Sequence, residues 1–100
     1  MDFQIRITEA ALAEFEEILA YSWANFPATA ERFGNALLNH IDLLRSFPYV
    51  GAPVVGRPGV RQLVHTPILI YYRVNEAPNF VEILHFWHRS RHDPTLGAAS

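Results

Sequence analysis

The second half of the chain contains three short apolar runs whose spacing leaves little choice of topology. They cover residues 60–65, 68–74 and 80–88, and each has the apolar content typical of a strand. The segments between them are a few residues long and contain Pro67 and Pro78. Parallel strands need a crossover of a dozen or more residues, whereas antiparallel strands need only a short turn. The spacing therefore predicts a three-stranded antiparallel meander.

The first half predicts one strand followed by two helices. Residues 3–7 alternate apolar and polar side chains, as a half-buried strand does. Thr8 stands where a helix N-cap is expected, and Glu9 lies in the first turn, where the helix dipole favours an acid. Pro27 separates two apolar stripes and suits the first turn of the second helix. The stripes are Ala11, Leu12, Phe15, Ile18, Leu19 and Phe26, then Ala30, Phe33, Leu37, Ile41, Leu44 and Phe47.

These elements together predict an α+β fold. An N-terminal strand precedes an antiparallel helical hairpin, and the three-stranded meander completes one sheet with the helices packed on one face. Residues 48–58, rich in Gly and Pro, are expected to form an irregular loop. We expect a single domain over residues 1–95 and a flexible tail over residues 96–100.

The hairpin can cover only one face of this sheet, which leaves the other for the tail or for a partner. In the middle strand, Ile68, Ile70, Tyr72 and Val74 form the more apolar side, and Leu69, Tyr71 and Arg73 form the other. The last strand is apolar on both sides, because Leu84 and Phe86 alternate with Val81, Ile83 and Trp87. An uncovered aromatic face is a candidate partner surface.

Composition excludes several classes of protein. Half of the 100 residues are hydrophobic, which is too many for a disordered chain, and no apolar run is long enough to span a membrane. The absence of Cys rules out a disulfide scaffold and a thiolate metal site. The N-terminal residues show no secretory signal, so we expect a cytoplasmic protein.

The net charge of −2 conceals an uneven distribution. Residues 1–47 hold seven acids and three Arg, for −4, whereas residues 48–100 hold five Arg and three acids, for +2. All eight basic residues are Arg, whose rigid fork suits phosphates and carboxylates. The densest basic cluster is Arg89, Arg91 and the neighbouring His88. It is either a solvated strand end or a contact surface for an acidic segment of a partner or for nucleic acid.

Several side chains have both a structural and a functional interpretation. Arg61 either binds a phosphate or partner carboxylate, or pairs with a helix acid such as Asp42. Tyr71 and Trp87 are either partner anchors or core residues. Three glutamates of the first helix are expected on a solvated face: Glu14, Glu16 and Glu17.

The histidines invite a metal site, but their spacing argues against one. His85, His88 and His92 are three and four residues apart, and residues three apart on a strand point to opposite faces. We therefore expect no metal there; His88 is the more credible general acid or base. His40 lies beside the second apolar stripe and is expected to be a hydrogen-bonded boundary residue.

An ordered set of short motifs resembles one known family. The residues are Tyr21, Pro27, Ala30, Phe33 and Leu37, then Phe47-Pro48-x-x-Gly51 and Gly59-x-Arg61, then Ile70-x-Tyr72-Arg73-Val74, and finally Ile83-Leu84-x-x-Trp87-His88-x-x-Arg91-x-x-Pro94. Over about residues 3–94 the chain resembles toxins of the RelE/ParE superfamily from bacterial toxin–antitoxin modules. The resemblance implies a cognate antitoxin whose C-terminal segment wraps the toxin in a hetero-oligomer, and autoregulation of the operon by the complex.

The superfamily implies two competing activities. RelE-like members cut mRNA on the ribosome, and ParE-like members are described as poisons of DNA gyrase. The RelE-like set matches incompletely here, because Leu69 stands at the middle-strand Arg position and no Tyr follows the C-terminal Arg. The resemblance therefore favours a ParE-like gyrase inhibitor that is not an enzyme and needs no cofactor or metal.

Two alternatives to that role stay open. One is a metal-independent mRNA endonuclease using Arg61, His88, Arg89 and Arg91, and the other is a non-toxic antitoxin-binding module. In any of these roles, the residues expected to contact a partner are Arg61, Tyr71, Arg73, Trp87, His88, Arg89 and Arg91.

Overall fold

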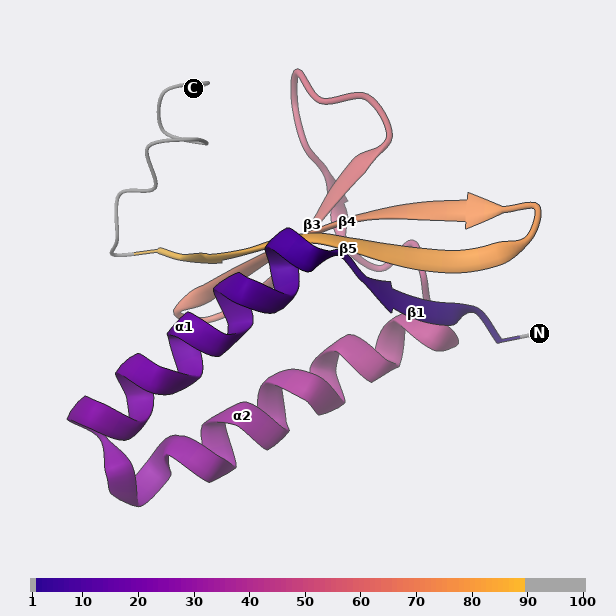
Figure 1. The fold of residues 1–100 in the computed structure, drawn as a ribbon. Helices are drawn as coiled ribbons and strands as arrows, with labels where there is room; N and C mark the ends of the chain where they lie inside the picture. Colours follow the sequence, from indigo (N-terminus) through magenta and orange to yellow (C-terminus); the bar gives the residue numbers. More distant parts are fainter. Residues whose placement is uncertain (1, 90–100) are drawn as a thin grey trace.

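The protein is a two-layer α+β fold, seen in a computed structural model that describes residues 2–89. Its elements are β1 (Gln4–Ile7), α1 (Glu9–Asn25), α2 (Pro27–Asp42), the 3-10 turn η1 (Leu43–Arg45), β2 (Ala52–Pro53), β3 (Val60–His65), β4 (Ile68–Glu76) and β5 (Asn79–His88). Both helices lie on one face of the sheet, and the loop before β3 rises on the opposite side (Figure 1). The predicted fold class is confirmed. The expected tail over residues 96–100 lies outside the described residues.

The sheet has five strands in the order β1-β5-β4-β3-β2. The predicted meander is confirmed, since β3 pairs antiparallel with β4 and β4 with β5, while β1 runs parallel to β5 at one edge. The loop expected over residues 48–58 contains a short strand that the sequence prediction missed. Ala52 and Pro53 pair with β3, and this place at the sheet edge tolerates a proline, which has no N–H to donate.

The start of each helix confirms the sequence signals. The Thr8 side chain accepts a hydrogen bond from the Ala11 N–H, so Thr8 caps α1. The same hydroxyl lies 3.0 Å from the Ile83 carbonyl oxygen, which ties the cap to β5. Pro27 occupies the first turn of α2, directly after Phe26.

The apolar stripes are only partly buried. Ala11 and Ile18 of α1 are buried, but Leu12 and Phe26, assigned to the same stripe, are 47% and 59% exposed. In the second stripe Ala30, Leu37, Ile41 and Leu44 are buried, and Phe47 is 59% exposed. The prediction was wrong at both distal aromatics: Phe26 lies at the junction between α1 and α2, and Phe47 lies two residues after the end of η1.

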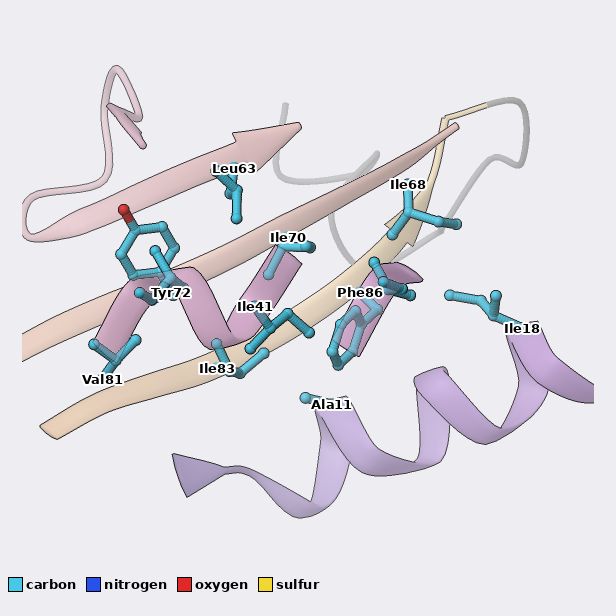
Figure 2. Packing of buried hydrophobic residues seen from close by; sticks show 12 residues of the cluster. Ala11, Ile18, Ile41, Leu63, Ile68, Ile70, Tyr72, Val81, Ile83 and Phe86 are labelled. Atoms are coloured by element: carbon cyan, nitrogen blue, oxygen red, sulfur yellow. The ribbon is translucent and has the colours of Figure 1, made fainter. Parts of the chain in front are cut away.

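The core lies between the helices and the face of the sheet that they cover. Figure 2 shows Ile70 and Tyr72 of β4 beside Ile83 and Phe86 of β5, with Ile41 of α2 among them. The two residues of β4 and the two of β5 are each at most 3% exposed. Burial of such apolar area is the main force that holds the two layers together.

A β-bulge in β5 changes which side chains face the core. Tyr71 pairs with His85 but Tyr72 pairs with Ile83, so Leu84 is an extra residue in β5. The predicted alternation, with Leu84 and Phe86 on one side and Val81 and Ile83 on the other, was therefore wrong. Beyond the bulge Phe86 returns to the core face together with Ile83. No local sequence signal marks a bulge between apolar residues.

Candidate functional site

Arg61, the first basic site residue expected from the sequence, fastens the loop before β3. It lies opposite Tyr72 in the β3–β4 register. Its guanidinium donates to the Gly51 carbonyl at 2.6 Å and to the Tyr49 carbonyl at 3.2 Å, and it lies 5.0 Å from the centre of the Tyr49 ring. The alternative pairing with Asp42 was wrong, because Asp42 binds Arg45 in the adjacent helical turn.

A buried tyrosine, the cross-strand neighbour of Arg61, holds the same loop. The Tyr72 hydroxyl accepts a hydrogen bond from the Gly51 N–H at 2.9 Å, and burial raises the pKa of this phenol. A Cβ at Gly51 would lie 2.6 Å from the Tyr72 hydroxyl and 2.7 Å from the Gln62 carbonyl oxygen. Only glycine fits there, which explains the glycine that follows Phe47-Pro48 in the motif.

The nuclease set named from the sequence is not gathered in one place. Arg61 lies opposite Tyr72 of β4, whereas His88 lies opposite Ile68, four residues before Tyr72 on the same strand. That separation is about 13 Å along the strand. Arg89 is exposed just beyond β5, and its backbone N–H donates to the Pro67 carbonyl. Arg91 lies outside the described residues.

An apolar groove opens where the tip of the helical hairpin meets the end of β5. We call it the hairpin groove; it has a volume of about 180 Å³ and is lined by Ile18, Tyr21, Ser22, Phe26, Thr29, Ala30, Phe33, Pro67 and His88. Tyr21 is 48% exposed, and its ring centre lies 6.4 Å from that of Phe26 and 6.4 Å from that of His88. Trp23, near the same tip, is 53% exposed. Of the groove residues, only His88 was named as a site residue from the sequence; the exposed aromatics at the helix ends were assigned to the core stripe or to the motif.

A second hollow lies on the face of the sheet that the helices do not cover, which we call the open face. This open-face hollow has a volume of about 310 Å³ and is lined by Thr8, Ala10, Arg57, Val60, Tyr71, Arg73, Leu84 and His85. It brings together Tyr71 and Arg73, both expected from the sequence to contact a partner, with Arg57 and His85, for which no partner contact was expected. Trp87 lies opposite Leu69 on the same face and is half-buried.

His85 is held in place by an acid of α1. Its Nδ1 lies 3.2 Å from both carboxylate oxygens of Glu14, and one of these oxygens also accepts the Phe86 N–H at 3.1 Å. The prediction of a solvated face was wrong for Glu14, which is partly buried, whereas Glu16 and Glu17 are exposed. The residues around Glu14 in the sequence do not indicate this contact, because its partner His85 lies 71 residues away.

The histidines behave as their spacing predicts. His85 lies opposite Tyr71 on the open face and His88 opposite Ile68 on the helix-covered face, while His92 lies outside the described residues. Within residues 2–89 no group of three or more His, Asp or Glu side chains is placed to hold a metal ion.

No helix within residues 2–89 is long and apolar enough to cross a membrane.

A separate histidine pair joins α2 to β3. His40, expected to be a hydrogen-bonded boundary residue, lies with its Nδ1 2.8 Å from Nδ1 of His65. Burial and the neighbouring His40 both lower the pKa of His65, so the pair favours a state in which at least one ring is neutral.

Solved structures with the same fold come from toxin–antitoxin systems. A chain of the chromosomal ParDE toxin–antitoxin system from P. aeruginosa matches with a TM-score of 0.74 and 21% identity, over 86% of this chain and 95% of that one. A chain of the toxin–antitoxin complex RelBE2 from Mycobacterium tuberculosis matches with a TM-score of 0.63 and 20% identity, over 89% of this chain and 100% of that one. None of the curated protein sequences searched matches this chain. This chain therefore shares its fold with both of these structures.

Comparison with protein families identifies the family to which the chain belongs. The model described as the ParE toxin of type II toxin–antitoxin systems, parDE, matches residues 5–93. The chain belongs to the ParE toxin family, the branch that the incomplete RelE-like set had favoured.

Proposed function

We propose that this ParE-type toxin inhibits DNA gyrase and is neutralised by a cognate antitoxin whose C-terminal segment docks in the hairpin groove. The family match supports the gyrase target, and the solved neighbours, which come from toxin–antitoxin systems, support the antitoxin. The observation that carries the docking site is the groove itself, with its exposed rings at the end of β5.

The character of the groove fits a protein segment. Its lining is mainly aromatic and aliphatic, with Tyr21 and Phe26 about half exposed. Large aromatic rings exposed at the rim of an apolar groove are typical anchors for a partner helix or strand. Salt screens charge pairs but has little effect on apolar burial, so antitoxin affinity should depend only weakly on ionic strength.

The endonuclease alternative receives less support. Arg61 already donates to two loop carbonyls, and His88 lies about 13 Å further along the sheet and lines the hairpin groove. Cleavage of a phosphodiester needs a general acid, a general base and charge-stabilising groups gathered around the same phosphorus atom. These two residues do not meet that requirement together.

A paired experiment tests the target. The chain is induced in cells without its antitoxin, and gyrase-dependent DNA cleavage is measured beside the mapping of mRNA ends in ribosome fractions. We expect trapped gyrase–DNA cleavage and intact mRNA. Codon-phased mRNA cuts with unaffected gyrase would overturn the gyrase target, and normal growth under verified expression would overturn both toxic activities.

A second experiment tests the docking site. Phe26→Asp places a charge in the groove and should weaken antitoxin binding by at least a hundredfold in isothermal titration calorimetry. Leu38→Asp is the matched control, because Leu38 is 43% exposed on α2 and does not line the groove. Equal losses in the two variants would show that the antitoxin binds elsewhere.

A further inference from the structure

The open-face hollow is lined by polar and charged side chains that neither antitoxin docking in the hairpin groove nor gyrase inhibition explains. We propose that it binds the phosphate of a nucleotide, either free or within a single nucleic-acid strand. The site is distinct from the hairpin groove, so this proposal goes beyond the proposed function and does not depend on the toxin's target.

Two guanidinium groups from different segments line the hollow. Arg73 comes from β4 and Arg57 from the loop before β3. Within residues 2–89 neither side chain forms a hydrogen bond or an ion pair, and both residues are exposed. Glu82 lies opposite Arg73 in the strand register, but no ion pair joins them. Arginine forks that are not neutralised by the protein are suited to an anion with several oxygens.

His85 adds a third polar group whose orientation is fixed. The bulge at Leu84 places His85 on the open face, and the two Glu14 oxygens hold its Nδ1. Because Glu14 also accepts the Phe86 N–H, the carboxylate is itself anchored to β5. Nε2 is then the ring nitrogen left for a ligand, and a ring held in place loses little entropy on binding.

Most of the remaining lining is apolar and suits a base or sugar rather than a bare anion. Val60, Leu84 and the Tyr71 ring form this part of the wall. Nucleic-acid bases stack on such aromatic side chains, and a basic neighbour then holds the backbone phosphate. The volume of about 310 Å³ is at the lower end of the range of small-ligand sites. One nucleotide is therefore the unit that fits.

Calorimetric titration of the full chain with adenosine 5′-monophosphate and with a single-stranded hexathymidylate tests the proposal. We expect saturable binding at one site, weakened at least tenfold by Arg73→Ala and by Arg57→Ala. Arg32→Ala is the matched control, since it removes the same charge from an exposed position on α2, and it should change the affinity by less than twofold. Tighter binding of the hexamer assigns the site to a strand, and tighter binding of the mononucleotide assigns it to a free nucleotide.

Two results would overturn the proposal. One is the absence of saturable binding by either probe. The other is an equal loss of affinity in Arg32→Ala and Arg73→Ala, which would mean that only the overall charge matters. Amide chemical-shift mapping separates this site from the groove: the mononucleotide should move the signals of Tyr71 and Leu84 and leave those of Tyr21 and Thr29 in place. The reverse pattern would place the ligand in the groove and also refute the proposal.

Discussion

Replacement of Arg61 by alanine distinguishes a structural arginine from a phosphate-binding one. The side chain is partly buried and donates to two carbonyls of one loop, at 2.6 Å to Gly51 and at 3.2 Å to Tyr49. Loss of these bonds leaves the buried Gly51 carbonyl without its charged partner. We therefore expect Arg61→Ala to destabilise the fold and to leave the activity of the folded fraction unchanged.

The expected loss of stability follows from the two hydrogen bonds that Arg61 donates. A hydrogen bond from a charged group contributes about 1.5–3 kcal/mol, and the longer, exposed bond to Tyr49 contributes at the low end or below. We expect a loss of about 2 kcal/mol in the free energy of unfolding. At about 4–8 °C per kcal/mol for a domain of this size, the melting temperature falls by about 10 °C.

Urea unfolding followed by circular dichroism measures this loss, with Arg32→Ala as the control. An exposed surface substitution changes stability by about 0.5 kcal/mol or less. A structural role for Arg61 is excluded if Arg61→Ala is as stable as the control, and more firmly if toxicity is lost while stability is kept. That second result would return Arg61 to a role in contacting nucleic acid or the target.

Substitutions at three further positions test other parts of the fold. Tyr72→Phe removes the acceptor of the buried Gly51 N–H and should cost about 1–3 kcal/mol in urea unfolding; no loss would show that the loop N–H has another acceptor. Thr8→Ala removes the α1 cap and should cost about 0.5–2 kcal/mol, whereas Thr8→Ser should restore most of it. The pKa of His65 is lowered in the folded state, so the unfolded chain binds more protons near pH 6 and stability should fall as the pH drops below about 6.5. This slope should decrease in His65→Gln, and an unchanged slope would exclude the His65–His40 pair as its source.

Most of the fold was predictable because local signals and chain length agreed. The Thr8 cap, the Pro27 helix start and the short gaps between strands fixed the hairpin and the meander, and all three are confirmed. The bulge at Leu84 was not predictable, because a run apolar on both sides fits either register. The pairing of Ala52 was missed for a related reason: two residues are too few to show a period.

The functional surfaces were predictable only in part. Tyr71 and Arg73 were named because alternation along one strand places them on the same face. Their neighbours Arg57 and His85 come from a loop and from a strand after a bulge, so no pattern linked them. Arg61 was named from the sequence, but its hydrogen-bond partners are backbone carbonyls. Every residue has such a carbonyl, so the sequence does not indicate which ones Arg61 contacts.

Inhibition of DNA gyrase, proposed above for this chain, is tested directly by a supercoiling assay. Purified gyrase and relaxed plasmid are incubated with increasing amounts of the chain freed from its antitoxin, and the topoisomers are separated on a gel. We expect loss of supercoiling with accumulation of cleaved plasmid, and reversal when antitoxin is added. Supercoiling that proceeds unchanged at an excess of properly folded chain would contradict it.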